Sequence, residues 1–532
     1  MPDRPDTISG ARAGAGWAAG AGLAVTAVVA LSLTASLVGV FYDDGIYLAL
    51  ARSLAGGHGY RLLYLPGAPG AVTYPLGYPL FLAALWKLFP SFPANVMLFK
   101  AANAVLLGAG AGLLVLYLGG RTAARPWRLA VLVAAAATAL PLVTVATVLF
   151  AEPLFLAVLV AACWAGDAAR DAESRRRAWL LAALAGLLAG AAALVRSLGV
   201  TAVVAIPLSL ALARRPRAAL VALGVSALCL APWLLWSARH RGEVDPALVA
   251  NYGTYGDLMA QAGRAAFSAG NVADLLRPIG AVALAPFHGW LRFFVGVPAV
   301  ALVVAGFGPL LRRAAALGWT LLAYAAVVLV WPYGPDRFVW AAWPFLAIAF
   351  FAGARQVAES ARSAAPAARA AGHWAVVATV VAVVGGYAYF QVRGYVRGDA
   401  TALGRGISAT VSELLPWVRE HTPPDAVVAG EDEALLWLYT GRRAVPSYVW
   451  RYRGRADVSL GPDSLKAWLD RSQVSYVLLG SAGSDAAPTI SELLGRHPGY
   501  LHVAQLWPPP ASAMAFAVDR SGAGSAPAGV AR

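Results

Sequence analysis

The amino-acid sequence predicts a polytopic all-α membrane protein of about eleven transmembrane helices, followed by a small C-terminal α/β domain. Three observations predict this fold class. Of the 532 residues, 59% are hydrophobic and only 13% are charged, whereas soluble domains carry about 25% charged residues. The apolar residues collect in long runs without charge, and the last of these runs ends near residue 392. A more polar tail follows it.

The uncharged runs give the expected crossings, because a helix needs about 20 apolar residues to span the hydrocarbon core. A twelfth candidate, 72–86, is only fifteen residues long and contains Pro75 and Pro79. We therefore expect that segment to be re-entrant or to lie on the surface. The eleven expected crossings are 13–42, 101–120, 129–151, 153–166, 178–195, 197–213, 218–238, 293–311, 314–335, 338–354 and 374–392.

The basic residues set the expected orientation, since Lys and Arg collect in cytoplasmic loops. With eleven crossings and a cytoplasmic N-terminus, the inside receives 17 basic and 6 acidic residues, and the outside 25 basic and 21 acidic. Counting 72–86 as a crossing would reverse every later loop and place the arginine clusters outside. The sequence thus predicts large outer regions at 42–94, at 239–292 and from 393 onward.

The expected domains follow from these boundaries. Residues 1–392 form the transmembrane domain, 393–520 an extracytoplasmic α/β domain, and 521–532 a disordered tail. Within the α/β domain, helical and extended patterns alternate. The expected helices are 408–421, 432–439, 465–471 and 490–496, and the expected strands are 426–429, 474–479, 502–507 and 513–518.

Several function classes are excluded. The formal charge is +15, but the arginines are scattered between apolar runs rather than gathered on one face, so we expect no nucleic-acid partner. Cys163 and Cys229 lie in apolar runs and indicate neither a disulfide framework nor a thiolate metal site. The seven histidines show no close metal-ligand spacing, and no phosphate-binding glycine loop is found. We predict no cofactor, with a divalent metal left open.

Two adjacent carboxylates, Asp43 and Asp44, stand where the first crossing leaves the membrane. One interpretation is helix capping, because Asp is favoured beside the orphan amides of a helix start. The other is a general base at the aqueous mouth of a membrane cavity, where burial and a neighbouring charge raise one pKa. The two roles are compatible.

More polar residues are expected on the same outer side. Glu152 lies in VLFAEPLFLAV, Arg196 in ALVRSLGV and Arg337 in DRFVWAAWPFLAI. Each could merely extend toward the membrane surface. Together, an acid and arginines suit a phosphate leaving group beside an acid/base centre. The first outer loop adds the candidate substrate-loop residues His58, Tyr60, Tyr74 and Tyr78.

The Asp-Asp pair, followed by LARSLAGGHGYR and TYPLGYPLFLAALWKLF, resembles the bacterial glycosyltransferase family 39. That group of C-type membrane glycosyltransferases includes protein O-mannosyltransferases, lipid A aminoarabinose transferases and lipopolysaccharide sugar transferases. AEPLF and DRFVWAAWPFLAI are similar to later motifs of the group. The resemblance covers about residues 20–355. The usual double proline is Pro75-Leu76 here, and no trefoil domain of the eukaryotic mannosyltransferases is present in the sequence.

The resemblance implies a C-type glycosyltransferase fold and transfer of a sugar, hexose or pentose, from a polyprenyl-phosphate donor. The acceptor hydroxyl, on a glycan, lipid or protein, would lie on the outer face of the bacterial cytoplasmic membrane, among membrane lipids. By position, Asp43 would be the base with Asp44 beside it, and Glu152 a second acidic site. Arg337 and Arg196 would hold the donor phosphate.

Attack opposite the leaving group predicts inversion. Two alternatives remain open. A transporter or flippase of lipid-linked saccharides would use the same phosphate site without the first-loop carboxylate. A catalytically silent envelope scaffold would use the tail to bind a partner.

Overall fold

The computed structural model divides the chain into two compact units. The first comprises Met1–Thr34, Lys100–Trp233 and Phe267–Thr401, and the second comprises Ala35–Phe99, Leu234–Ala266 and Ala402–Arg532. Of the tail expected to be disordered, 521–532, only Ser521 lies within the described residues. The described residues are 7–122, 124–263, 270–331, 334–363, 365–454, 456–480, 484–508 and 513–521.

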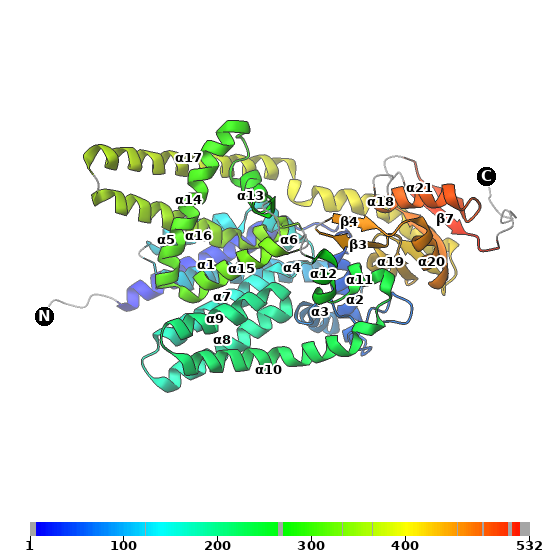
Figure 1. Ribbon diagram of the computed structural model, residues 1–532, viewed down its shortest axis with the longest axis horizontal. Coiled ribbons are helices and arrows are strands. Elements are labelled where there is room, and N and C mark those ends of the chain that lie inside the picture. Colours follow the sequence, from blue (N-terminus) through cyan, green and yellow to red (C-terminus); the bar gives the residue numbers. More distant parts are fainter. Residues whose placement is uncertain are drawn as a thin grey trace. The chain divides into compact units, whose positions relative to one another are not determined.

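The first unit is helical, and its chain can be followed by colour in Figure 1. The long helices α14, α16 and α17 lie side by side within it. Three helices, α4, α10 and α18, have most of their length in one unit and continue into the other. The helices with all or most of their residues in the first unit are α1 (Thr7–Leu31), α4 (Val96–Gly119), α5 (Pro126–Ala137), α6 (Leu140–Thr147), α7 (Glu152–Asp171), α8 (Arg175–Val195), α9 (Val200–Leu212), α10 (Pro216–His240), α13 (Gly270–Ala283), α14 (Gly289–Arg313), α15 (Ala315–Val330), α16 (Asp336–Ser360) and α17 (Pro366–Arg397).

The uncharged runs of the sequence coincide with these helices. Within the described residues, eight helices are long and apolar enough to cross a membrane, and the bent pair α5–α6 makes a ninth if it is one span. Two shorter apolar helices, Ser197–Leu212 and Ala315–Val330, coincide with the other two expected runs. The polytopic helical fold is therefore confirmed, with eight or nine spans by this measure where about eleven are expected.

The bend of 63° between α5 and α6 follows from two local features. Pro141 lies in the first turn of α6 and has no amide hydrogen to continue the α5 ladder. The hydroxyl of Thr138, just after α5, donates instead to the carbonyl of Ala134 at 2.8 Å. The chain therefore ends one helix and starts another within the same uncharged run.

The segment 72–86 is not a long helix. Its helical part is α3 (Gly77–Leu88), which has 12 residues and a length of about 18 Å at 1.5 Å per residue. The hydrocarbon core is about 30 Å thick. The helix is thus too short to cross, in line with the expectation of a surface-lying or re-entrant segment.

The second unit contains the first outer loop, part of the second and the tail. A five-stranded sheet has the order β2-β1-β5-β7-β6, and β3 and β4 form a separate two-stranded sheet. In Figure 1 the tail runs from yellow to red. The elements are α2 (Asp43–Ala55), α3, α11 (Val249–Tyr252), α12 (Tyr255–Ala262), α18 (Asp399–His421), β1 (Val427–Gly430), α19 (Glu433–Thr440), β2 (Arg443–Pro446), β3 (Trp450–Arg453), β4 (Ala456–Ser459), α20 (Pro462–Arg471), β5 (Val474–Leu479), α21 (Ala486–Arg496), β6 (Leu501–Leu506) and β7 (Met514–Val518).

The expected α/β tail is confirmed. β1 pairs in parallel with β2 and β5, while β7 pairs antiparallel with β5 and β6. A parallel pair needs a crossover, and α19 provides the one between β1 and β2. Val428 and Leu478 of the sheet pack with Leu435 of α19, with Val418 of α18 and with Val40, which lies between α1 and α2. The expected first crossing, 13–42, is therefore too long at its end, because its helix stops at Leu31 and Val40 belongs to the core of the second unit.

Candidate functional site

The first outer loop turns sharply where α2 begins. Tyr42, the residue before the helix, has φ 63° and ψ −70°, in a region that a bulky residue rarely adopts. Its hydroxyl accepts a hydrogen bond of 3.1 Å from Nδ2 of Asn251 in the second outer loop. A strained backbone persists only where its surroundings hold it, and such positions cluster at functional sites.

Asp44 anchors the chain entering this helix. Its Oδ2 accepts a hydrogen bond of 2.7 Å from the amide of Gly39, and its Oδ1 one of 3.0 Å from the amide of Phe41. The side chain is buried, and burial raises its pKa to about 6, against the opposing effect of these amides. Both carboxylate oxygens are therefore engaged with the backbone of the preceding turn.

Asp43 has a different environment. It is partly exposed, and its Oδ1 accepts a hydrogen bond of 2.8 Å from the hydroxyl of Tyr74. The ring of Tyr74 packs edge-on against Tyr47, with centroids 5.4 Å apart. Tyr47 in turn packs edge-on against Tyr78 at 5.1 Å. The carboxylate of Asp43 thus lies at the edge of an aromatic cluster that fixes its hydrogen-bond donor.

Three of the four candidate substrate-loop residues belong to this cluster. Tyr60 donates a hydrogen bond of 2.8 Å to the carbonyl of Tyr74, and Tyr60, Tyr74 and Tyr78 are all buried. His58 is exposed, and within the described residues its backbone amide bonds to Ser53 at 3.0 Å while no contact of its ring with the tyrosines is found. The structure therefore separates His58 from the other three.

The tail contributes a buried carboxyl that the sequence analysis did not single out. The hydroxyl of Tyr252 donates a hydrogen bond to Oε1 of Glu433, which is fully buried at the start of α19. Its Oε2 has no hydrogen-bond partner among the described residues. Burial raises the pKa of Glu433 to about 8. The run EDE at 431–433, just before an apolar helix, is the signal that could have indicated it.

The neighbouring Asp432 has a similarly perturbed carboxyl group. Burial raises its pKa to about 7, and the negative charge of Asp44 contributes in the same direction. The second unit therefore brings acids of the first loop and of the tail within electrostatic range of each other.

In the first unit, one carboxylate lies between two arginines. Glu152, the first residue of α7, is fully buried, and its Oε1 lies 2.6 Å from Nη1 of Arg196. Nε of Arg337, near the start of α16, donates to the same oxygen. Arg196 lies at the break between α8 and α9. The structure therefore brings together three of the predicted site residues, Glu152, Arg196 and Arg337.

Aromatic rings pack against the two arginines of this triad. The guanidinium of Arg337 lies 3.6 Å from the ring centroid of Phe150, and that of Arg196 lies 5.5 Å from the ring of Phe338. Asn103 of α4 donates to the carbonyl of Phe150 at 3.0 Å. Two guanidinium groups that converge on one carboxylate also offer the planar, forked donors that suit a phosphate group.

The triad belongs to the first unit, whereas Asp43 and Asp44 belong to the second. The shared outer side of Asp43, Asp44, Glu152 and Arg337 predicts that these four line one cavity, and this stays a prediction. Within the described residues, no group of three or more His, Cys, Asp or Glu side chains is placed to hold a metal ion.

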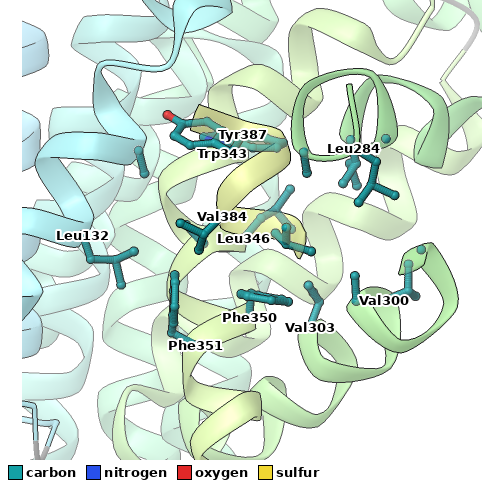
Figure 2. A pocket seen from close by; sticks show the side chains of 18 of the residues that line it. Leu132, Leu284, Val300, Val303, Trp343, Leu346, Phe350, Phe351, Val384 and Tyr387 are labelled. Carbon is teal, nitrogen blue, oxygen red and sulfur yellow. The ribbon is translucent and has the colours of Figure 1, made fainter. Parts of the chain in front are cut away.

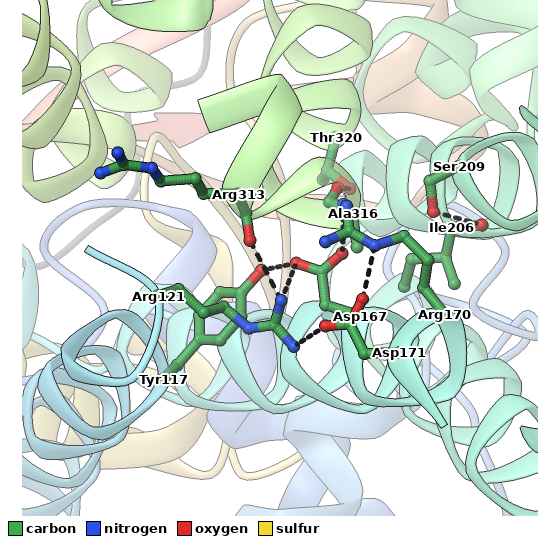
Figure 3. Close-up of polar contacts among 10 residues, drawn as sticks. All are labelled: Tyr117, Arg121, Asp167, Arg170, Asp171, Ile206, Ser209, Arg313, Ala316 and Thr320. Carbon is green, nitrogen blue, oxygen red and sulfur yellow. Dashed lines mark hydrogen bonds and ion pairs between the residues drawn. The ribbon is translucent and has the colours of Figure 1, made fainter. Parts of the chain in front are cut away.

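A second buried cluster surrounds Asp167 of α7 (Figure 3), about 22 Å from Glu152 along the helix at 1.5 Å per residue. Asp167 accepts hydrogen bonds from Tyr117 at 2.5 Å and from the amide of Ala316 at 3.1 Å. Because Ala316 lies in the first turn of α15, the carboxylate complements the positive end of that helix. Arg121 and Arg170 lie 4.0 and 3.6 Å from it.

No family model matches the sequence, and no curated protein matches it either. Solved structures do match. ArnT from Cupriavidus metallidurans is similar in the apo state (TM-score 0.56) and bound to undecaprenyl phosphate (TM-score 0.57), each at 15% identity. The apo match covers 94% of this chain and 97% of ArnT, and the bound match 95% and 98%.

The Archaeoglobus fulgidus oligosaccharyltransferase, tethered with an acceptor peptide, is also similar, with TM-score 0.52 and 12% identity. This match covers 95% of this chain and 74% of that one. The likeness to these membrane proteins confirms the C-type glycosyltransferase fold that the sequence resemblance implies.

Proposed function

We propose that this protein transfers a sugar from a polyprenyl-phosphate carrier to an acceptor hydroxyl on the outer face of the bacterial cytoplasmic membrane. The observation that carries the proposal is the buried carboxylate of Glu152 between the guanidinium groups of Arg196 and Arg337, in a chain that has the fold of ArnT bound to undecaprenyl phosphate. Outside the cytoplasm, a sugar on a lipid phosphate is the activated donor that a membrane protein can reach.

The proposed reaction is a single displacement. Asp43 accepts the proton of the acceptor hydroxyl, and the acceptor oxygen forms a bond to the anomeric carbon. The bond from that carbon to the phosphate oxygen breaks, and its electron pair leaves on the polyprenyl phosphate. The product has inverted configuration, because the attack comes opposite the leaving group. A positioned base contributes about 10²- to 10⁴-fold to such a step.

Asp43 is the better candidate for the base, and Asp44 for an anchor. Both oxygens of Asp44 accept backbone hydrogen bonds at 2.7 and 3.0 Å. Proton transfer through Asp44 would weaken the contacts that shape the turn. Asp43 is partly exposed and is oriented by Tyr74, which suits a group that must meet a substrate.

In this mechanism the arginines bind the donor phosphate and stabilise the charge that develops on it. Their guanidinium groups are held in place before the donor arrives, by Glu152 and by the neighbouring rings. Such preorganised groups need no rearrangement during the reaction. Glu152 thus acts as a positioning residue for the two arginines.

The test is turnover of a defined donor by the purified full chain. Polyprenyl-phosphate hexose and pentose are offered separately with envelope glycans as acceptor, and products are identified by mass spectrometry. Asp43→Asn should abolish transfer and keep donor binding. A flippase would move the donor across vesicles both as the parent protein and as Asp43→Asn, so a parent protein that transports the donor without transferring the sugar would overturn the proposal.

A further inference from the structure

The first unit contains a large cavity between α5, α13, α14, α16 and α17. Its volume is about 1420 Å³, beyond the roughly 300–1,000 Å³ of pockets for drug-sized ligands. Leu132 of α5, Val300 of α14 and Leu346 of α16 project into it from different helices (Figure 2). The wall is apolar over most of its area, which suits hydrocarbon chains.

At one end of the cavity, two aromatic rings bridge α16 and α17. Trp343 of α16 stacks on Tyr387 of α17 with ring centroids 5.8 Å apart, and Figure 2 shows the two rings together at that end. The hydroxyl of Tyr387 donates to the carbonyl of Ala135 at 2.6 Å. Arg337 precedes Trp343 by six residues, about 9 Å along α16. Arg337, which we assign to the donor phosphate, thus lies beyond the Trp343–Tyr387 end.

The opposite end is basic. Arg125 and Arg128, at the start of α5, and Arg355 of α16 line the cavity there. Arg355 pairs with Glu359 at 2.7 Å, and the positive charges of Arg355, Arg362 and Arg313 all act on that one carboxylate. Arg125 and Arg128 have no carboxylate within pairing distance among the described residues. This end therefore has an excess of positive charge.

The Trp343–Tyr387 end has less excess positive charge. Among the described residues that line the cavity there, Arg277 is paired with Asp336 at 3.6 Å and Arg292 is the only other arginine. From Trp343 to Arg355 the wall on α16 is twelve residues long, about 18 Å. This length accommodates an extended acyl chain from the basic end to the Trp343–Tyr387 bridge.

We infer that this cavity is a binding site for one anionic glycerophospholipid, with its head group at Arg125, Arg128 and Arg355 and its acyl chains along the apolar wall. Basic pockets between transmembrane helices on the cytoplasmic side bind anionic lipid head groups. The assignment to the cytoplasmic leaflet rests on the topology in the proposed function. The binding site itself does not depend on the catalytic residues.

The lipid would also supply packing for α17. Only Thr379, Gly386 and Gly394 of its 32 residues are buried, so this helix has little protein around it. Acyl chains between α17 and the helices α5, α14 and α16 would fill the space that side chains leave open, since packing contacts rather than a hydrophobic force hold helices together in lipid.

The test measures lipid retention by the purified full chain. The protein is placed in nanodiscs with equal amounts of phosphatidylglycerol and phosphatidylcholine, and bound lipid is identified by native mass spectrometry. We expect selective retention of phosphatidylglycerol. In Arg125→Gln/Arg128→Gln its affinity should fall roughly 30-fold, equivalent to about 2 kcal/mol for two arginines at a membrane surface.

Two further variants distinguish the effect of the basic residues from the effect of the apolar cavity on lipid retention. Arg176→Gln/Arg177→Gln, in the exposed first turn of α8, removes the same charge away from the cavity and should leave retention unchanged. Val300→Trp, at a partly exposed wall position, should reduce retention by filling the space for the acyl chains. Equal retention of both lipids, or an equal loss in the α8 control, would overturn the inference.

Undecaprenyl phosphate is added as a competitor in a third arm. If it displaces phosphatidylglycerol and its binding is lost in Val300→Trp, the cavity holds the donor chain and the inference is wrong. Sugar transfer is not measured in any arm, so a failure of the proposed reaction cannot produce these outcomes.

Discussion

The hydroxyl of Tyr74 donates a hydrogen bond of 2.8 Å to Oδ1 of Asp43 across 31 residues of the first outer loop. This bond fixes the orientation of the carboxylate before any acceptor is present. Orientation of a reacting group ahead of the chemical step is a large part of catalytic power. The relationship also distinguishes Asp43 from Asp44, whose partners are backbone amides.

Asp43→Asn should depress kcat by about 10²- to 10⁴-fold with little change in donor affinity, because it removes a proton acceptor used mainly in the transition state. Steady-state rates and binding of a polyprenyl-phosphate sugar are measured side by side. As a comparison, Asp44→Asn should lower thermal stability, since it disturbs two buried hydrogen bonds. Unchanged turnover in Asp43→Asn would remove the assigned base.

Tyr74→Phe should reduce kcat by roughly fivefold while KM changes little, because it removes one hydrogen bond worth about 1 kcal/mol from the orienting contact. Tyr389→Phe, at an exposed position of α17, is the matched control. A loss of affinity without a loss of kcat would show that the tyrosine contacts substrate instead of orienting the base.

Arg337→Ala should weaken donor binding as well as turnover, by about tenfold or more, since a charge-assisted contact to phosphate exists already in the ground state. Arg337→Lys should restore only part of the donor affinity and turnover, because Lys lacks the planar guanidinium group that binds two phosphate oxygens. Arg312→Ala, on an exposed helix end, controls for loss of a charge. Donor binding that survives Arg337→Ala would contradict the assigned phosphate site.

Glu433 should make the stability of the protein depend on pH. Burial raises its pKa to about 8, so between about 4.5 and 8 the folded state retains a proton that the unfolded chain has released. The contribution of Glu433 to the free energy of unfolding is therefore greatest below about pH 4.5 and is lost as the pH rises to about 8. Glu433→Gln should unfold at a higher temperature than the parent protein at pH 9 and at a similar temperature at pH 5. Parallel melting curves at all pH values would contradict this.

The topology predicts an extracytoplasmic tail. A reporter enzyme active only outside the cytoplasm, fused after Gly398 at the end of α17, should be active. The control is a fusion after Arg217, at the start of α10, which should be inactive because that loop is expected inside. A silent but folded reporter after Gly398 would overturn the outer-face site.

The helical part of the fold could be predicted because membrane thickness imposes a length on apolar runs. The break between α5 and α6 was harder to predict, since a proline and a threonine end the helix inside one uncharged run. In the tail, β5 was predicted with its observed limits, Val474–Leu479, because it is apolar and rich in strand-forming residues. The strands β2, β3 and β4 were missed. β2 begins with an arginine and ends with a proline, and β3 and β4 alternate apolar with charged or polar side chains, whereas the equally short β1 is apolar throughout.

The candidate site also contains residues that the sequence indicates and residues that it does not. Asp43, Glu152, Arg196 and Arg337 are visible in the sequence as charges at the ends of apolar runs. The bond between Tyr252 and Glu433 joins residues 181 positions apart, and no local pattern indicates it. Asp167 was counted only as a cytoplasmic charge, because nothing in its neighbourhood indicates the amide of Ala316 that it binds.

The Asp167 cluster bears on the alternative of a transporter or flippase. Arg121, two residues after the end of α4, donates to the carbonyl of Arg313 at the end of α14 at 3.0 Å and pairs with Asp171 of α7 at 2.7 Å. Asp167 of the same helix binds the start of α15. Four helix ends are thus fastened at one point. Alternating access requires the helices to separate at each side in turn, and here separation would expose a buried carboxylate without its partners. This fastening favours the proposed transferase over a flippase, because sugar transfer does not require these helices to separate.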